Sequence, residues 1–435
     1  MFGSGAELNR RWSRTAYSGK PCRKISCLHG LLAGTIAWSA PAQARPSWVG
    51  SWGASQVGTV CPEIARQTVV QVMRLSAGGR DVRVRFSNEL GQFPLSIGRA
   101  SVQAVAAGAG ARPVAPALLT FGRGARSSVV AAGSSVLTDP VSLHLPPLAD
   151  VRVYIYIDRD TGPMPCHPLG MATAVISAPG DYTSGASLPS AKTVTARLVV
   201  TGIDTGPQAD GAVVLLGDSI TDGYHSGMDQ NHRFSDFVAQ GLVSAGSSLG
   251  VVNAGISGNR LLHDLPTVRR GPSALSRFDR DVLDVSGVRV VVLLEGINDI
   301  GVPDSQGLPD QAVSAKDIIA GYQQLIGRAH ASGLMIMGGT LTPFANTAED
   351  HYYSVGKEQK REAVNRWIRV SGQFDAVIDF DAALADPAQP TQLRPIFDSG
   401  DHLHPNDRGY QVMGRLTAKA LDAALDHARG RPARD

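Results

Sequence analysis

The sequence predicts an α/β domain with a parallel sheet, preceded by an antiparallel β-sandwich. Short β-rich runs separated by Gly, Pro and Ser clusters fill residues 48–198. From about Gly211, apolar β-rich runs alternate with helical patterns, which is typical of parallel strands joined by helices. With 435 residues, the chain is long enough for two or three domains.

The N-terminal prediction depends on period-two alternation. Residues 82–86 and 151–156 alternate apolar and polar side chains, so that one face of each strand is apolar. Many such strands with turn signals between them favour a sandwich. Expected strands include residues 68–75, 81–86, 127–130, 141–145 and 151–157.

The C-terminal prediction depends on five apolar runs that read as strands buried on both faces. These expected strands are residues 212–216, 251–254, 288–294, 334–337 and 377–380. Helical patterns lie between and after them, at residues 234–244, 273–285, 315–331, 356–370 and 406–425. A Gly/Asp/Pro-rich stretch at residues 201–209 marks the boundary, which predicts a β-rich domain at 45–205 and an α/β domain at 206–435.

Residues 1–44 have the pattern of a signal peptide. A basic stretch reaches Lys24, an apolar run follows, and Ala42-Gln43-Ala44 is a small-x-small cleavage pattern. We therefore expect export to the periplasm or the medium. The formal net charge of the whole chain is +3, and residues 1–44 alone contribute +5, so the remainder has a net charge of −2. The mature chain therefore gives no basis for a nucleic-acid partner. No run of about 20 apolar residues predicts a membrane span in the mature chain.

Two of the four cysteines, Cys61 and Cys166, lie outside the leader. Export would place them in an oxidising compartment, where a disulfide is favoured. The alternative is a pair of buried free thiols.

Four polar blocks each follow a different predicted strand or precede the last helix. Ligands bind outside the carboxyl ends of strands in an open parallel sheet, so these blocks are expected to meet at one edge. A serine nucleophile needs a positioned histidine base that a carboxylate orients. The blocks are Gly217-Asp218-Ser219, Ile256-Ser257-Gly258-Asn259-Arg260, Glu295-Gly296-Ile297-Asn298-Asp299 and Asp401-His402-Leu403-His404.

In this order the blocks closely resemble those of the SGNH or GDSL hydrolase superfamily, over residues 212–425. The resemblance implies a flavodoxin-like three-layer fold with a five-stranded parallel sheet. It implies Ser219 as nucleophile, His404 as general base and Asp401 as the orienting carboxylate. The implied oxyanion hole is the N–H of Ser219, the N–H of Gly258 and the side-chain amide of Asn298, and no cofactor is required.

The sequence also allows two other interpretations of its polar motifs. Asp401, His402 and His404 could bind a metal, but no Cys or His cluster completes such a site, so no metal is expected. Gly246 to Gly250 matches a Gly-x-Ser-x-Gly elbow, yet it precedes a strand and is expected to be a turn.

Six further polar residues lie in or near the blocks. Asp299 could be a second catalytic carboxylate or could anchor its loop. Arg260 and Asp264 are candidates for substrate binding, with solvated loop positions as the alternative, as is His263. We expect surface positions for His225 and His232.

The β-rich part resembles, more diffusely, extracellular proteins of the acetylxylan-esterase type. Together the resemblances imply an exported serine esterase that removes short acyl groups such as acetyl from a carbohydrate ester. Alternatives are a lipase or lysophospholipase with an apolar groove near Leu261, Leu262 and Phe344, an acyltransferase with the same site, and a non-catalytic carbohydrate-binding protein. The sequence does not determine the oligomeric state.

Overall fold

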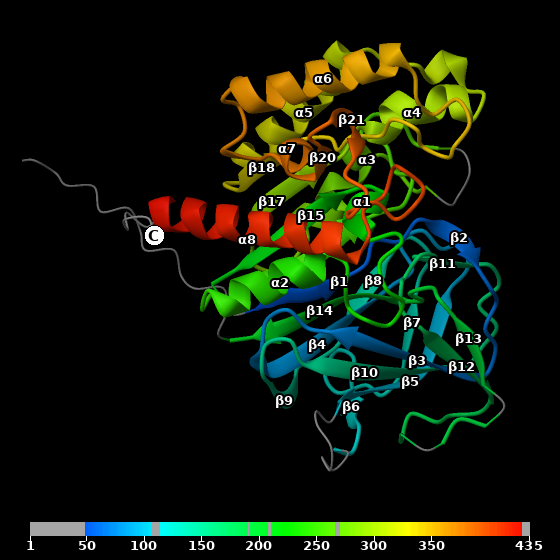
Figure 1. The fold of residues 1–435 in the computed structure, drawn as a ribbon. Helices are drawn as coiled ribbons and strands as arrows, with labels where there is room; N and C mark the ends of the chain where they lie inside the picture. The colour runs from blue at the N-terminus through cyan, green and yellow to red at the C-terminus, as the bar shows by residue number, and fades with distance from the viewer. Residues whose placement is uncertain are drawn as a thin grey trace, which may run out of the picture. The chain divides into compact units, whose positions relative to one another are not determined.

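The computed structural model describes residues 48–105, 114–185, 187–189, 191–207, 210–265 and 270–428. The predicted signal peptide at 1–44 lies outside these residues. The described residues form two large hydrophobic cores, one in the β-rich part and one around the parallel sheet, and a small third cluster of Val49 and Ala77. Figure 1 shows the arrangement of their elements.

The β-rich part consists of two antiparallel sheets with a shared core. Val82, Val84 and Phe86 of one sheet are fully buried, and so are Val151 and Val153 of the other. The period-two alternation seen in the sequence therefore points the apolar side chains of both sheets inward, as a sandwich requires. The first sheet has β1 (Val49–Gly53), β14 (Val200–Gly206), β4 (Gly79–Ser87) and β8 (Ser135–Leu137), with β9 (Val141–Leu145) also on β4. The second has β13 (Lys192–Val194), β12 (Ala174–Pro179), β3 (Gln67–Arg74), β10 (Asp150–Ile157), β5 (Leu95–Ala104) and β6 (Ala117–Leu119), with β7 (Ser128–Val130) also on β5.

A small hairpin-like pair of strands lies beside the sandwich. Strand β2 (Gly58–Cys61) pairs with β11 (Met164–Cys166), and Cys61 and Cys166 form the expected disulfide. The bond joins segments 105 residues apart in sequence. We call this pair the disulfide hairpin.

The five-stranded parallel sheet is confirmed. Its order is β16 (Gly250–Gly255), β15 (Ala212–Gly217), β17 (Val288–Leu294), β18 (Met335–Gly339) and β19 (Ala376–Ile378). One face is covered by α2 (Phe234–Ser244) and α8 (Asp407–Ala428), which pack on each other. The other face carries α3 (Ala274–Phe278), the π-helix η1 (Asp279–Leu283) and α5 (Ala315–Ala331), with α6 (Val355–Val370) packed on α5. The remaining elements are α1 (Ser219–Asp222), α4 (Ile297–Ser305), η2 (Pro309–Gln311), α7 (Phe380–Leu384), β20 (Ala385–Asp386) and β21 (Gln389–Leu393).

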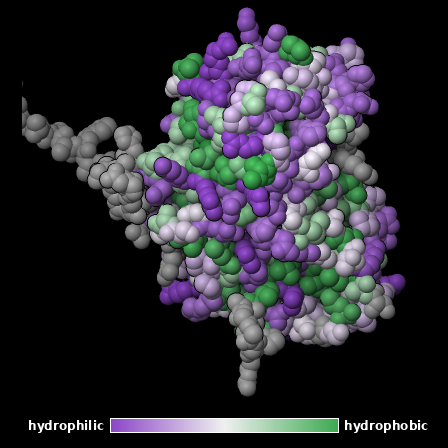
Figure 2. All heavy atoms as spheres, in the orientation of Figure 1, coloured by the Kyte–Doolittle hydropathy of each residue, from purple (hydrophilic) through white to green (hydrophobic). Residues whose placement is uncertain are grey.

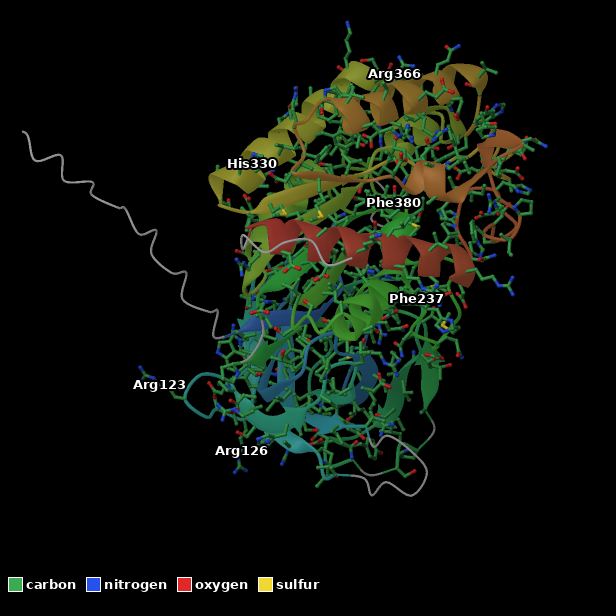
Figure 3. All side chains as sticks on the ribbon, turned by 60° about the vertical axis from the view of Figure 1, so that its left-hand side comes forward. Arg123, Arg126, Phe237, His330, Arg366 and Phe380 are labelled. Atoms are coloured by element: carbon green, nitrogen blue, oxygen red, sulfur yellow. A yellow bond between two sulfur atoms is a disulfide. The ribbon has the colours of Figure 1, made fainter. Side chains whose placement is uncertain are left out.

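Two expected elements differ in detail. The strand expected at 377–380 ends at Ile378, because Asp379 caps α7 by accepting a hydrogen bond from the Ala382 N–H at 3.1 Å. The helix expected at 273–285 changes from α to π geometry after Phe278. Phe380 and Phe237 of α2, both labelled in Figure 3, belong to the core of the α/β part.

The sandwich covers the edge of the parallel sheet at β16. The Gly50 N–H donates to the Ser286 carbonyl at 2.8 Å, and the Val251 N–H donates to Ser76 Oγ at 2.7 Å. A side chain at Gly50 would collide with Val252 and Val285. Contact this close removes an exposed strand edge and joins the two parts of the chain.

Hydrophilic side chains cover most of the face shown in Figure 2, with smaller hydrophobic groups among them. Within the described residues, every helix is too short or too polar to cross a membrane.

Replacing Cys61 and Cys166 together by Ser is expected to lower the free energy of unfolding by about 2–5 kcal/mol, since the bond closes a loop of roughly 100 residues. Urea unfolding followed by tryptophan fluorescence measures the effect. Wild-type protein with reductant serves as the second sample. An unchanged urea midpoint in both would contradict the prediction.

Candidate active site

The site begins where β15 ends. Asp218 follows this strand and caps α1, since its Oδ1 accepts a hydrogen bond from the Ile220 N–H at 2.9 Å. Ser219 is therefore the first residue of α1, where helix N–H groups lack intrahelical partners. Its exposed fraction is only 7%. The turn thus presents one hydroxyl and one free N–H at the carboxyl end of the sheet.

Ser219, His404 and Asp401 form a hydrogen-bonded row. Ser219 Oγ lies 2.7 Å from His404 Nε2, and His404 Nδ1 lies 2.6 Å from Asp401 Oδ2. The other oxygen of Asp401 accepts hydrogen bonds from the N–H groups of Leu403 (3.0 Å) and His404 (2.8 Å). The row has the order that nucleophilic catalysis by serine requires.

The environment of Asp401 keeps it ionised. Burial opposes the charge, but the hydrogen bond and the charge of His404, followed by the two backbone N–H groups, hold the pKa of Asp401 well below its usual range. An ionised Asp401 accepts the Nδ1–H of His404. His404 Nε2 is then free to take a proton from Ser219 Oγ.

Gly258 and Asn298 line the same pocket as Ser219. Gly258 has a φ of 75°, which favours glycine, and a side chain there would collide with the stem of Arg270. Asn298 Nδ2 donates to the Asn259 carbonyl at 2.9 Å, while its Oδ1 accepts from the Tyr352 hydroxyl at 2.8 Å. One amide hydrogen of Asn298 remains for a ligand.

The pocket around these groups has a volume of about 480 Å³. Val60, Pro168 and Leu169 come from the N-terminal part, at or beside the disulfide hairpin. Sequence reasoning missed these residues, because no local pattern connects them with a site some 50 to 160 residues further along the chain. The other lining residues are Ser219, Tyr224, Ser257, Gly258, Arg270, Asn298, Glu349, Leu403 and His404.

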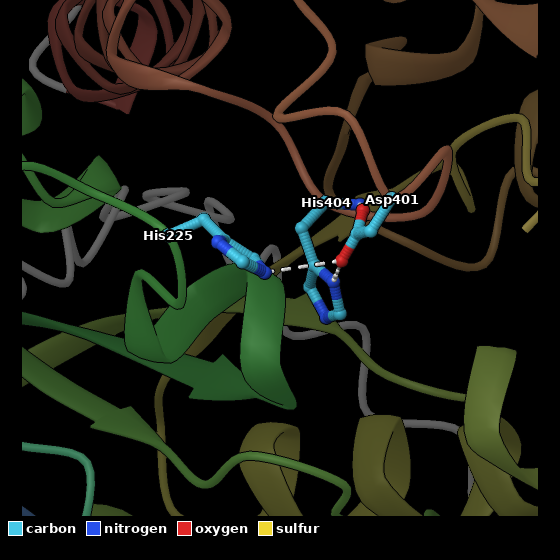
Figure 4. Close-up of side chains that lie close together, drawn as sticks. All are labelled: His225, Asp401 and His404. Carbon is cyan, nitrogen blue, oxygen red and sulfur yellow. Dashed lines mark hydrogen bonds and ion pairs between the residues drawn. The ribbon is translucent and has the colours of Figure 1, made fainter. Parts of the chain in front are cut away.

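His225 lies closer to the site than the sequence suggested. Its side chain is 40% exposed, yet its Nε2 lies 3.3 Å from Asp401 Oδ2 (Figure 4). His225, Asp401 and His404 offer ligand-type atoms within 4.8 Å of one another. A cation there would have to displace the hydrogen bond between Asp401 and His404.

The remaining histidines near the blocks have other partners. His402 Nδ1 contacts Asp398 at 2.5 Å rather than the site, so the metal set that included His402 is not assembled. His232 is 38% exposed and bonds Asp407 at 2.7 Å, in agreement with its expected surface position.

Arg260 and Asp264 are absent from the pocket wall. The Arg260 side chain is fully buried and donates to the Gln311 side chain at 2.5 Å and to its carbonyl at 3.0 Å. Asp264 accepts from the Ser273 N–H at 2.6 Å. Both residues shape loops in this structure.

Asp299 also shapes a loop rather than facing the pocket. Its two oxygens accept from the N–H groups of Leu261 (2.7 Å) and Leu262 (3.0 Å). Burial raises the pKa of Asp299 to about 6, although these two hydrogen bonds lower it. Of the two interpretations of Asp299, the geometry supports the loop anchor.

Two more carboxyl groups are buried beneath the turn that contains Ser219. Burial raises the pKa of Asp218 to about 7, and burial together with Asp218 raises that of Glu295. The Arg277 guanidinium opposes both shifts and lies 3.9 Å from Glu295. These groups differ from Asp401, whose charge is satisfied by hydrogen bonds.

Comparisons with known proteins concern the α/β part. Residues 215–412 match the sequence model of the GDSL-like Lipase/Acylhydrolase family. A search of curated proteins finds no match. Similar solved structures include the native aryl esterase of M. smegmatis, with 17% identity and a TM-score of 0.39, covering 48% of this chain and 98% of that one. The acetyl xylan esterase AlAXEase has 20% identity and a TM-score of 0.37, and the match covers 48% of this chain and 99% of that one. An acylhydrolase described as putative, from Bacteroides fragilis NCTC 9343, has 20% identity and a TM-score of 0.38, and the match covers 50% of this chain and 91% of that one.

The Asp218→Asn variant is expected to make stability less dependent on pH. A carboxyl whose pKa is about 7 when folded and about 4 when unfolded keeps its proton longer in the folded state. Its contribution to stability is therefore lost as pH rises from about 4 to 7. Asn retains the cap at Ile220 and cannot ionise.

Urea midpoints at pH 4.5, 6 and 8 measure this effect. The midpoint of the variant minus that of the wild type should rise with pH. Asp317→Asn is the control: hydrogen bonds from Ser314 lower the pKa of the exposed Asp317, so its contribution to stability is lost only as the pH falls below about 4, and its difference from the wild type should stay flat between pH 4.5 and 8. A difference for Asp218→Asn that stays flat or falls with pH would sink the prediction.

Proposed function

We propose that this protein is an exported serine esterase that acts on short-chain acyl esters of carbohydrate, acetyl esters above all. The proposal proceeds from the match of residues 215–412 to the GDSL-like lipase/acylhydrolase family, which makes the protein a carboxylic ester hydrolase. The observation that carries this proposal is the row Ser219–His404–Asp401, which opens on a pocket with oxyanion donors. Within the proposal, residues 1–44 are the signal peptide, 45–205 the β-rich domain and 206–435 the hydrolase domain.

The proposed mechanism has two steps. Ser219 Oγ attacks the ester carbonyl as His404 Nε2 takes its proton, and His404 then protonates the leaving alcohol oxygen. Water, deprotonated by His404, hydrolyses the acyl-Ser219 and restores the free hydroxyl. Asp401 stays ionised and stabilises the imidazolium in both steps.

The developing oxyanion is bound by the N–H groups of Ser219 and Gly258 and by Asn298 Nδ2. Each such donor contributes roughly 10²- to 10³-fold in rate. The bonds from Asn298 to Tyr352 and Asn259 orient its amide before substrate arrives.

The pocket wall supports a short acyl group and a polar alcohol. Val60, Leu169 and Leu403 bound the cavity with apolar side chains, while Arg270 and Glu349 bring charged groups that suit a hydroxyl-rich alcohol. Of the three residues expected near an apolar groove for a lipase, Leu261 and Phe344 are fully buried in the core and Leu262 is partly buried. An acyltransferase would use the same groups, with a sugar hydroxyl in place of water.

Ser219→Ala is expected to lower kcat/KM for p-nitrophenyl acetate by at least about 10⁴-fold, because the nucleophile is removed. Ser244→Ala, which alters an exposed hydroxyl on α2, is the matched control. Activity in Ser219→Ala close to that of the control would refute the serine mechanism. Release of acetate from acetylated xylan, and transfer to added oligosaccharide instead of water, separate esterase from acyltransferase.

Leu169→Ala is expected to shift preference toward longer acyl chains. The wild-type enzyme should favour acetate, and the variant should raise the butyrate-to-acetate ratio of kcat/KM roughly tenfold, since one or two methylenes then fit the widened wall. Leu118→Ala, a partly exposed leucine of β6, serves as the control. A wild-type preference for palmitate would favour the lipase alternative.

A further inference from the structure

His167 is a buried histidine that follows the disulfide hairpin directly. It is adjacent to Cys166 and only 5% exposed. Both ring nitrogens have partners: Nδ1 lies 2.9 Å from the Ser55 carbonyl, and Nε2 lies 2.9 Å from Asp222 Oδ1. His167 thus connects the N-terminal part with the last residue of α1, the helix that starts at Ser219.

The partners of His167 determine its charge. A carbonyl oxygen only accepts hydrogen bonds, so Nδ1 must carry a proton. A carboxylate also accepts, so Nε2 carries a second proton and the ring is an imidazolium. Burial lowers the pKa of His167. The charge of Asp222, the hydrogen bond to Asp222 and the hydrogen bond to the Ser55 carbonyl together raise the pKa by more than burial lowers it, so the net shift is upward. His167 and Asp222 form a buried ion pair.

Asp222 uses its second oxygen to hold the loop that contains Gly258. Its Oδ2 accepts from the Ser257 N–H at 3.1 Å and from Ser257 Oγ at 2.8 Å. Ser257 precedes Gly258 directly. A side chain at Gly255 would collide with the Asp222 backbone, so the loop and α1 are in close contact. One carboxylate therefore joins the nucleophile helix, the Gly258 loop and the N-terminal part.

We propose that His167 is a positioning residue of the esterase: through Asp222 it holds the Ser257–Gly258 loop where the Gly258 N–H meets the oxyanion. The N-terminal part is then a component of the catalytic apparatus as well as a wall of the pocket. This inference rests on the proposed function.

Direct participation of His167 in catalysis does not fit its placement. His167 is not among the residues that line the pocket, and both of its nitrogens are occupied. The disulfide at Cys166 holds the backbone next to it. Its effect on the reaction must therefore pass through Asp222 and Ser257.

The test compares His167→Ala, Asp222→Ala and Asp222→Asn in the full chain with p-nitrophenyl acetate. Asn retains an oxygen for Ser257, and its Nδ2–H is able to donate to a neutral His167. Oxyanion contacts act in the transition state, so both Ala variants should lose about 10- to 100-fold in kcat with KM nearly unchanged. Asp222→Asn should retain kcat within about threefold, and the two Ala substitutions together should lose no more than the worse one alone.

Active-site titration separates positioning from folding. The burst of p-nitrophenol counts the functional Ser219 residues, and kcat is expressed per site. His330→Ala is the matched control, because His330 pairs with Asp375 at 3.0 Å at the opposite end of the sheet (Figure 3). It should leave kcat per site unchanged.

Three outcomes would overturn the proposal: unchanged kcat per site in His167→Ala, a fall that lies entirely in the number of sites, or no rescue by Asp222→Asn. Ser219→Ala, measured alongside, distinguishes a failure of the proposed function from a failure of the present inference. If that variant remains active, the proposed function fails. If it is inactive while His167→Ala retains full kcat per site, only the present inference fails.

Discussion

The parallel register of β15 with its two neighbours is the constraint on which the site depends. Gly217, the last residue of β15, pairs with Gly255 on β16 and with Leu294 on β17. Three strands therefore end level with one another. Ser219, Gly258 and Asn298 follow these paired positions by two to four residues, so the proposed nucleophile and the proposed oxyanion donors meet without any long loop. His404 is brought to the same edge by the segment that precedes α8.

Carboxyl groups close together in this region differ in charge because their environments differ. Asp401 is surrounded by N–H donors and the His404 ring, which favour its ionised form. Asp218 and Glu295 lie deeper, where burial favours the neutral form. The same physical rule thus yields an orienting carboxylate at the pocket and largely structural carboxyls beneath the turn.

Two of the connections between the N-terminal part and the α/β part concern the sheet edge and the site. Main-chain and serine hydrogen bonds join β1 and Ser76 to the region of β16, which covers a strand edge. The disulfide hairpin reaches the carboxyl end of the sheet, where its neighbours line the pocket and His167 pairs with Asp222. The first connection covers the edge of the parallel sheet, and the second relates the sandwich to the proposed chemistry.

Local patterns in the sequence were sufficient to predict the order of elements, the five parallel strands and the blocks that gather at their ends. Strand and helix periods are properties of neighbouring residues, and parallel strands that end together bring their loops together. The disulfide was also foreseeable, since only two cysteines lay beyond the leader. Tertiary structure alone decided that the side chains of Arg260 and Asp264 bond to neighbouring loops and that His225 approaches Asp401. It also placed His167, Val60 and Leu169 beside the site. Those positions depend on packing between segments far apart in the chain, and such packing leaves no period in the sequence.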